Sequence, residues 1–200
     1  MWIVKLGGSL IGSPELPRWL DVLARHGDGR IVIVPGGGLF ADAVRDAQRL
    51  TDMGDATAHH LALLAMDQYG LLLTSLCPQL VTAASELELA ERSWQHRAIV
   101  WLPSKMVLAE ENIPQSWEMT SDSLAAWLAS RLQASRLVLV KSVAPELLDG
   151  AEQALQVVDA KFHEYVRGGE FQCWITTKSA HEHFESSLQS GEGTGVRIIF

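Results

Sequence analysis

Basic residues are scarce in this sequence, and their scarcity argues against one class of partner. The 200 residues include 16 Lys and Arg against 24 Asp and Glu, a formal net charge of -8 at pH 7. A protein that binds a nucleic-acid duplex through its phosphates needs a dense basic surface, because affinity comes largely from counterion release. We therefore expect no nucleic-acid partner, and any phosphate that this chain binds must meet a local positive site.

Long apolar runs and cysteine frameworks are missing as well. The apolar stretch 70–80 is interrupted by hydroxyl residues and Pro78, so no segment reaches the roughly twenty apolar residues of a membrane helix. The chain starts MWIVKLGG, without a basic region followed by an apolar one, and we expect a cytoplasmic protein with no membrane partner. Cys77 and Cys173 have neither disulfide nor zinc-site spacing, and buried free thiols are the simpler interpretation.

The composition is that of a folded domain. Hydrophobic residues make up 48% of the chain and charged residues only 20%, which excludes a disordered or fibrous protein. Two hundred residues are enough to bury one continuous core. No stretch rich in proline, glycine or serine divides the chain, so we expect a single domain over residues 1–200.

Short apolar runs alternate with helical patterns along the chain. One run over 2–6 ends at two glycines, another over 30–34 ends at Pro35 and three glycines, and residues 14–26 between them have helical spacing. Further strands are expected at 80–83, 98–102, 137–141, 172–176 and 196–200, and further helices at 39–50, 56–76, 86–92, 121–132 and 180–188. This alternation predicts an α/β fold, a three-layer αβα sandwich around a largely parallel sheet, with 143–158 as an excursion from the core.

Glycines directly follow two of the expected strands, where α/β sheets bind their ligands. Gly7 and Gly8 lack a Cβ and let backbone N–H groups approach a phosphate, with the Lys5 ammonium two residues upstream. The glycines at 36–38 precede a helix whose N-terminus carries partial positive charge. Either loop alone is compatible with a simple tight turn, but the two together favour a phosphate site. Neither matches a Walker A or a Gly-x-Gly-x-x-Gly pattern.

Two of the five lysines end expected strands, and an aspartate follows later in the chain. Lys5 and Lys141 are either solvated strand ends or point charges for phosphoryl oxygens, and their shared position at the ligand edge favours the second interpretation. Asp122 falls in the first turn of the helix expected at 121–132, where helix capping is the simpler interpretation. The alternative, compatible with capping, is that Asp122 binds both ammonium groups and holds them at a transferring phosphoryl group.

Four segments in order resemble the amino acid kinase superfamily: VKLGGSL, IVIVPGGG, TSDSLAAWLA and GEGTGVRIIF. Within it, PGGGLFADAVRDAQ, AHHLALLAMDQYG, WLPSKMVL and SWEMTSDSL are most similar to the short archaeal-type kinases that phosphorylate an aminomethylfuran phosphate in methanofuran-type cofactor synthesis. The resemblance implies ATP as the phosphoryl donor, Mg²⁺ carried by the nucleotide, a small phosphorylated acceptor, and a homodimer or higher homo-oligomer. The seven histidines lack metal-site spacing and are expected at the surface or in pocket walls.

The resemblance also assigns roles to individual residues. The catalytic residues would be Lys5, Asp122 and Lys141. The nucleotide would contact Gly7, Gly8, Ser9, Ser142, Asp149 and Gly150. The acceptor would contact Gly36, Gly37, Gly38, Asp67, Ser104, Lys105 and Ser121. Trp117 stands close to the Thr-Ser-Asp motif at 120–122 and would form an aromatic wall for the acceptor. After residue 140 the chain departs from the family, because it reads KSVAP where the family shows Thr-Asp or Thr-Lys before Val-Asp-Gly.

The implied mechanism is in-line transfer of the γ-phosphoryl group, catalysed by positioning and charge neutralisation. A phosphate monoester acceptor is already ionised near neutral pH and needs no general base. Two alternatives remain open. The acceptor is a carboxylate or another phosphate, as in acetylglutamate, isopentenyl phosphate and uridylate kinases, or the chain is a nucleotide-binding regulatory or storage subunit without turnover. The departure after residue 140 supports the second alternative, and the presence of Lys5, Asp122 and Lys141 together speaks against it.

Overall fold

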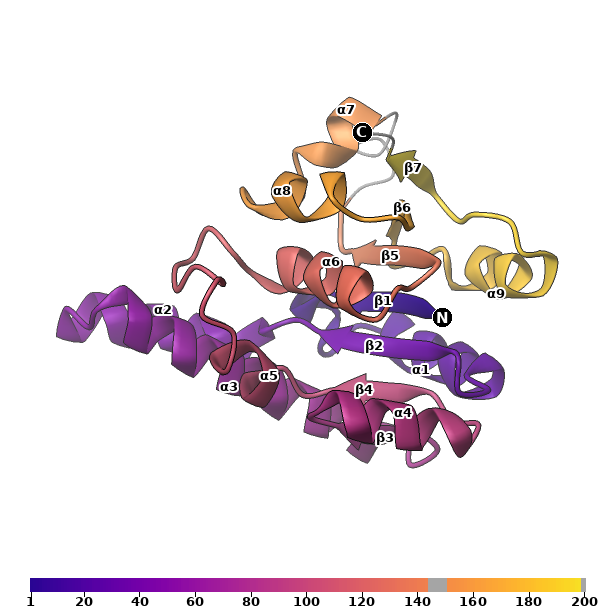
Figure 1. The fold of residues 1–200 in the computed structure, drawn as a ribbon, viewed down its shortest axis with the longest axis horizontal. Helices are drawn as coiled ribbons and strands as arrows, with labels where there is room; N and C mark the ends of the chain where they lie inside the picture. The colour runs from indigo at the N-terminus through magenta and orange to yellow at the C-terminus, as the bar shows by residue number, and fades with distance from the viewer. Residues whose placement is uncertain (144–150, 199–200) are drawn as a thin grey trace.

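A seven-stranded sheet crosses the whole molecule in the order β3-β4-β2-β1-β5-β6-β7 (Figure 1). The computed structural model describes residues 1–143 and 151–198. The strands are β1 (Trp2–Leu6), β2 (Ile31–Pro35), β3 (Val81–Ala83), β4 (Ile99–Trp101), β5 (Arg136–Lys141), β6 (Gln172–Thr177) and β7 (Val196–Ile198). Neighbouring strands are parallel except β6 and β7, which pair antiparallel. All seven expected strands are present, which confirms the largely parallel sheet.

Helices cover both faces of the sheet, so the predicted three-layer α/β fold is confirmed (Figure 1). They are α1 (Glu15–His26), α2 (Gly38–Thr51), α3 (Asp55–Leu76), α4 (Glu86–Trp94), α5 (Ser104–Leu108), α6 (Ser121–Arg131), α7 (Ala151–Leu155), α8 (Phe162–Arg167) and α9 (His181–Ser190), with a 3-10 turn over Gly8–Leu10. The core contacts place α1 and α9 on one face and α4, α5, α6 and α8 on the other, while α3 contributes to both. The short helices α5, α7 and α8 were not predicted, because five or six residues are too few to show a helical period.

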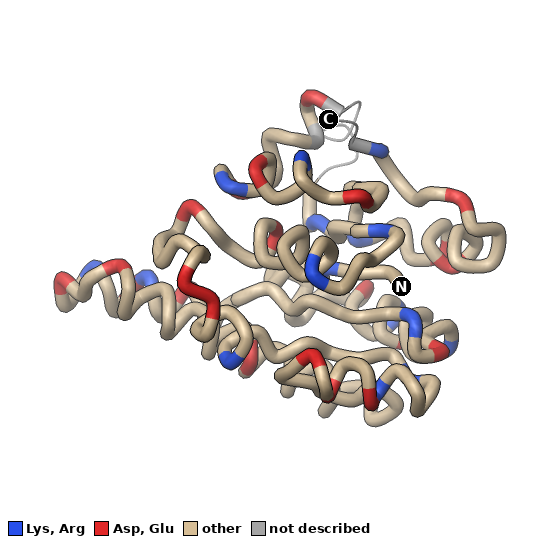
Figure 2. Tube along the Cα trace, in the orientation of Figure 1, with Lys and Arg blue, Asp and Glu red and all other residues tan. Residues whose placement is uncertain are grey.

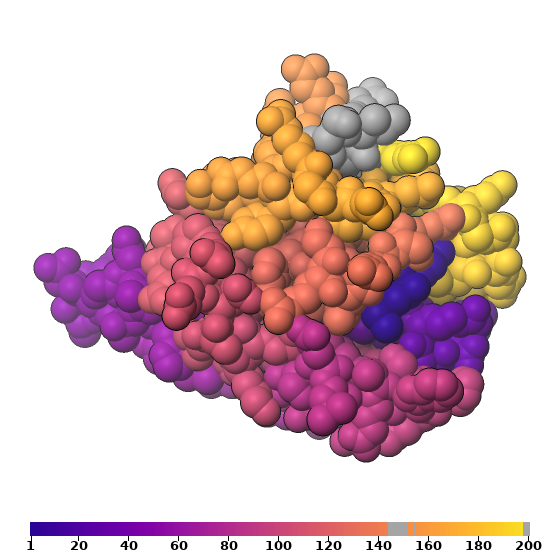
Figure 3. Space-filling view, viewed as in Figure 1, coloured from indigo at the N-terminus to yellow at the C-terminus, as the bar shows by residue number. Residues whose placement is uncertain are grey.

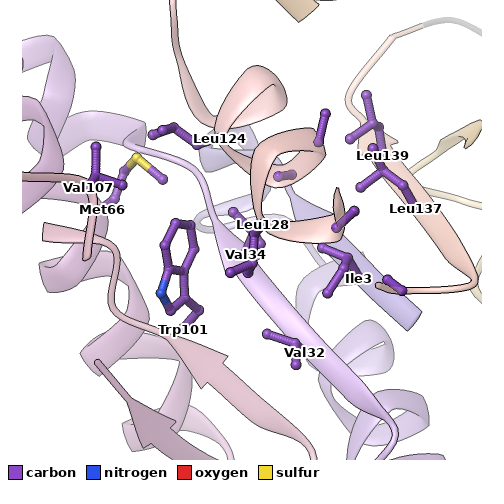
Figure 4. Close-up of a cluster of buried hydrophobic side chains, with 14 of the residues drawn as sticks. Ile3, Val32, Val34, Met66, Trp101, Val107, Leu124, Leu128, Leu137 and Leu139 are labelled. Atoms are coloured by element: carbon purple, nitrogen blue, oxygen red, sulfur yellow. The ribbon is translucent and has the colours of Figure 1, made fainter. Parts of the chain in front are cut away.

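The face covered by α6 determines where the site lies. Side chains along a strand alternate between the two faces, and Ile3, Leu137 and Leu139 all belong to the buried cluster that contacts α6. Figure 4 shows them beside Leu124 and Leu128 of that helix. The side chains two positions after Ile3 and Leu139 also point to the α6 face, and they lie at the carboxyl edge of the sheet.

The surface shows no concentration of basic charge on one element within the described residues. Figure 2 shows Lys and Arg spread over many elements and interspersed with Asp and Glu. The charge pattern agrees with the argument against a duplex-binding surface.

Helix α2 extends from one end of the molecule (Figures 1 and 3), and Leu50 near its end is 85% exposed.

Candidate active site

Lys5 and Lys141 end neighbouring strands on the same face of the sheet. β1 pairs with β5 in parallel, and each lysine follows by two positions a residue that packs against α6, Ile3 before Lys5 and Leu139 before Lys141. Because side chains alternate along a strand, both ammonium groups point toward the start of α6. The two lysines predicted from the sequence therefore belong to one cluster.

Asp122 in the first turn of α6 pairs with both lysines. The Nζ atom of Lys5 lies 3.0 Å from Oδ1 of Asp122, and the Nζ atom of Lys141 lies 2.5 Å from Oδ2. Asp122 is 3% exposed and Lys5 is 5% exposed, so solvent screens their charges weakly. The predicted contact is present. Both carboxylate oxygens face ammonium groups, so capping is not what Asp122 does here.

Burial and charge act in opposite directions on the pKa of Asp122. Burial alone raises the pKa of this carboxyl, but the ammonium groups of Lys5 and Lys141 outweigh it and hold the pKa below its usual value. Burial and the neighbouring Lys5 charge lower the pKa of Lys141, while Asp122 opposes them. One carboxylate against two ammonium groups leaves net positive charge at the ligand edge of the sheet, which suits phosphoryl oxygens.

Asp159 caps α6 from a distant part of the chain. Its Oδ2 accepts hydrogen bonds from N of Thr120 at 3.0 Å, Oγ1 of Thr120 at 2.8 Å and N of Ser123 at 3.0 Å, and its Oδ1 accepts one from Oγ of Ser123. The backbone N of Lys161 also donates to the Glu118 carbonyl at 3.1 Å. Asp159 was not predicted, because no local pattern links it to residues 36 positions earlier.

Replacing Asp159 by alanine is expected to destabilise the protein and to loosen the turn that carries Asp122. Hydrogen bonds to a charged group contribute about 1.5–3 kcal/mol each, so the free energy of unfolding should fall by at least that amount. Asp159→Asn keeps an acceptor oxygen for Thr120 and should recover part of the loss. Urea unfolding of the three proteins measures the effect, and an alanine variant as stable as the wild type would contradict the capping role.

The two glycine loops pack directly on each other. A Cβ on Gly8 would lie 2.0 Å from the backbone N of Gly38, and a Cβ on Gly36 would lie 2.5 Å from the backbone N of Gly8. Gly38 has a φ of +54°, in the left-handed region that favours glycine. Close packing explains why glycine is needed at these positions, and the same missing Cβ atoms leave backbone N–H groups accessible to a ligand.

A cavity of about 440 Å³ lies beside these loops. Its walls come from the loops, from α2 and α3, and from the segment that leads into α6. The predicted residues that line it are Gly8, Ser9, Gly37, Gly38, Trp117 and Ser121. Gly7 and Gly36 are buried and do not line this cavity. Residues from both glycine loops and from the start of α6 therefore meet at one cavity, and their contacts with a nucleotide or an acceptor stay predictions.

Four residues expected to contact the acceptor are not among those that line this cavity: Gly36, Asp67, Ser104 and Lys105. The Asp67 carboxylate accepts hydrogen bonds from N of Ser104 at 3.2 Å and from its Oγ, so the pair joins α3 to α5. Burial raises the pKa of Asp67. Lys105 is exposed. Asp67 and Ser104 bind each other in this structure, and their contact with an acceptor stays a prediction.

The residues expected at the nucleotide base have little structural description. Ser142 is exposed after the end of β5. Asp149 and Gly150 lie outside the described residues. Of the described residues predicted to contact the nucleotide, Gly8 and Ser9 line the cavity.

Trp117 forms part of the cavity wall rather than part of the core. It is half-buried, its Nε1 donates a hydrogen bond to Oε1 of Gln48 at 2.7 Å, and the Arg45 guanidinium lies 4.4 Å from its ring centroid. Arg45 lines the same cavity with Asp42 and His59, and none of these three was predicted as a site residue. Asp42 and Arg45 lie one helical turn apart soon after Gly38, and this spacing in the sequence could have indicated them as site residues.

The described part of the chain contains no candidate membrane-spanning helix and no candidate cluster of metal ligands. Among residues 1–143 and 151–198, no helix is both long and apolar enough to cross a membrane. In the same part of the chain, no group of three or more His, Cys, Asp and Glu is arranged to hold a metal ion.

The sequence is similar to one family and to a protein of known activity. The profile of the amino acid kinase family matches residues 1–145. The 5-(aminomethyl)furan-3-ylmethyl phosphate kinase of Methanocaldococcus jannaschii is 31% identical over 145 residues. The aligned stretch spans 72% of this chain and 66% of that protein, so the chain matches somewhat less than two thirds of its relative's length.

Several solved structures have the same fold. A uridylate kinase from Archaeoglobus fulgidus superimposes with a TM-score of 0.74 at 17% identity, over 99% of both chains. A UMP kinase from Bacillus anthracis has a TM-score of 0.71 at 13% identity, over 98% of this chain and 94% of that one. An aspartate kinase from Synechocystis has a TM-score of 0.67 at 16% identity, over 99% of this chain and 39% of that one. Identities this low show the fold alone.

Proposed function

Because the chain belongs to the amino acid kinase family, we propose that it transfers the γ-phosphoryl group of ATP to a small phosphate monoester of the aminomethylfuran type. One observation carries the proposal: Asp122 holds two lysines at the edge of the sheet, beside two glycine loops and a cavity. A protein that only binds a nucleotide has no need of two buried ammonium groups on one carboxylate. The buried cluster therefore argues against a storage or regulatory subunit without turnover.

The glycine loops and the lysine cluster would have different roles in phosphoryl transfer. The first glycine loop, with Ser9, would bind the nucleotide phosphates through backbone N–H groups, and the second would bind the reacting oxygen of the acceptor. Lys5 and Lys141 would neutralise the charge that spreads over the transferring group, and Asp122 would keep them apart at a set distance. An ionised phosphate acceptor needs no base, and the proposal assigns none.

Mg²⁺ would be bound mainly by the nucleotide. Both oxygens of Asp122 already face ammonium groups, so this carboxylate is a poor ligand for a second cation. The hard oxygen donors that Mg²⁺ prefers would then be phosphate oxygens and water, and the ion would supply charge neutralisation.

The choice of acceptor depends on the relative and on the cavity. The relative of known activity carries an aminomethylfuran phosphate in its name, and Trp117 offers an aromatic wall of the right kind for a flat ring. We also propose that the chain acts as one domain and as a homo-oligomer, since α3 exposes the leucines Leu61, Leu64, Leu71 and Leu76.

A panel of acceptors with Mg-ATP tests the proposal directly. ADP release would be measured with 5-(aminomethyl)furan-3-ylmethyl phosphate, UMP, isopentenyl phosphate and N-acetylglutamate. The aminomethylfuran phosphate is expected to have the highest kcat/KM. Efficient turnover of one of the other three would show that the chain is a kinase with a different acceptor. No turnover of any acceptor would contradict the proposal.

Replacing Trp117 by alanine is expected to raise the KM for the acceptor and to leave the KM for ATP nearly unchanged. Loss of an aromatic contact in a half-buried wall costs about 0.5–1.5 kcal/mol beyond the buried area, or roughly 2- to 10-fold in affinity. Steady-state kinetics and a melting curve measure the two effects. A large drop in Tm with an unchanged acceptor KM would show that Trp117 is structural.

A further inference from the structure

The end of the cavity away from the lysine cluster carries three electron-rich groups. We define this distal end by the lining residues Asp42, Arg45, His59 and Trp117. A carboxylate, an imidazole and an indole ring each attract a cation or an N–H donor. Phosphoryl transfer at Lys5 and Asp122 uses none of them, so this end is available to recognise the part of the acceptor that does not react.

His59 offers a hydrogen-bond acceptor to the cavity. It is 5% exposed, and its Nε2 is buried without a hydrogen-bond partner among the described residues. The backbone of Ser116 lies close enough to the ring to raise the pKa of His59 through a hydrogen bond, but burial outweighs this effect. Burial lowers the pKa of His59 and favours the neutral imidazole, which has one ring nitrogen that can accept a hydrogen bond. A buried polar atom of this kind is costly unless a ligand pairs with it.

Asp42 and Trp117 already bind a cation of the protein itself. The Arg45 guanidinium lies 4.4 Å from the Trp117 ring centroid, and its Nη1 lies 2.8 Å from Oδ1 of Asp42. The Trp117 N–H donates to Gln48, so the indole offers the cavity only its ring. The side chains of Arg45 and Asp42 are 48% and 70% exposed, so Arg45 has room to turn to solvent when another cation takes its place.

We propose that the distal end of the cavity binds a primary ammonium group on the acceptor. His59 Nε2 and the Asp42 carboxylate would accept its N–H groups, and the Trp117 ring would face its charge. The inference rests on the proposed function, since it names what the non-reacting end of the acceptor carries. An acceptor with an anionic tail is the competing possibility, and it would pair with Arg45 instead.

Two acceptors that differ only in the amine test the inference. The probes are 5-(aminomethyl)furan-3-ylmethyl phosphate and its analogue with a methyl group in place of the aminomethyl group. The wild type is expected to prefer the amine by about 10- to 100-fold in kcat/KM, the range given by one hydrogen bond to a charged group. His59→Leu and Asp42→Asn should each reduce this preference at least several-fold, mainly by raising the KM for the amine.

The chain provides a matched control for each variant. His60→Leu changes the exposed histidine next to His59, and Asp46→Asn changes an exposed aspartate that pairs with Arg49 as Asp42 pairs with Arg45. Both controls should keep the wild-type preference. Melting curves check that every variant is folded.

The outcomes separate this inference from the function on which it rests. Equal use of the two acceptors by the wild type, or an unchanged preference in both His59→Leu and Asp42→Asn, would overturn the ammonium site while leaving the kinase in place. Preference for an acceptor with a carboxylate in place of the amine, lost in Arg45→Ala, would overturn it in favour of an anionic tail. If the wild type phosphorylates no furan phosphate at all, the proposed acceptor fails and the ammonium site fails with it.

Discussion

Asp122→Asn is expected to reduce phosphoryl transfer by roughly 10²- to 10³-fold, the loss typical of removing one preorganised electrostatic group at a transition state. Asparagine has nearly the same shape, so the change removes charge and little else. Without the carboxylate, Lys5 and Lys141 face each other with no counterion at the distances that Asp122 now sets. They will repel, or Lys141, whose pKa burial and Lys5 already lower, will lose its proton.

Stability provides a second readout for the same variant. If Asp122 only capped α6, asparagine would serve as well and the free energy of unfolding would stay within about 1 kcal/mol. Since Asp122 pairs with two buried ammonium groups, removing its charge should instead cost up to about 3–5 kcal/mol. Deprotonation of Lys141 would reduce that cost.

Asp55→Asn provides the control, because Asp55 is also in the first turn of a helix but is exposed. It should keep wild-type turnover and stability. ADP release and melting temperature would be measured on the same preparations of both variants. A folded Asp122→Asn protein with wild-type turnover would remove Asp122 from the mechanism.

The sequence allowed the strands of the sheet and the placement of the two lysines to be predicted, for a definite physical reason. Apolar runs that end in glycine or lysine carry their own boundary signal, so the strands and the positions of Lys5 and Lys141 could be read directly. The period of two along a strand then places both lysines on the face of α6. Local patterns of this kind need no knowledge of distant contacts.

Several of the features that escaped prediction depend on contacts between distant residues. Asp159 caps α6 from 36 residues beyond Ser123, and the pairing of Asp67 with Ser104 depends on how α3 packs against α5. His59 was foreseen only as a surface or pocket-wall histidine, because its buried Nε2 becomes apparent only when α3 is placed beside Ser116. A local sequence pattern indicates which residues of a segment share a face, but it does not indicate which distant segments pack together.

Lys141→Met is expected to lower kcat by roughly 10²- to 10³-fold with a smaller change in the KM for ATP. A charge that neutralises the moving phosphoryl group acts mainly in the transition state, so its loss falls on turnover. Methionine preserves the length and apolar stem of lysine and removes only the ammonium group. Lys5→Met should show the same pattern, because both ammonium groups face the same carboxylate.

The pH dependence of turnover distinguishes a catalytic Lys141 from a merely structural one. Burial and the Lys5 charge lower the pKa of Lys141 below its usual value, so the protonated form needed for charge neutralisation is lost at lower pH than for an ordinary lysine. The kcat of the wild type should therefore decline on the alkaline side before an exposed lysine titrates. Lys141→Arg keeps its charge to higher pH and should move the alkaline decline of kcat to higher pH, even if its overall turnover is reduced.

Lys161→Met is the control, because it changes a lysine that pairs with Glu164 at the surface, and it should leave both the rate and its pH profile unchanged. An alkaline limb that is identical in the wild type and in Lys141→Arg would show that the ammonium group of Lys141 does not act at the transferring phosphoryl group.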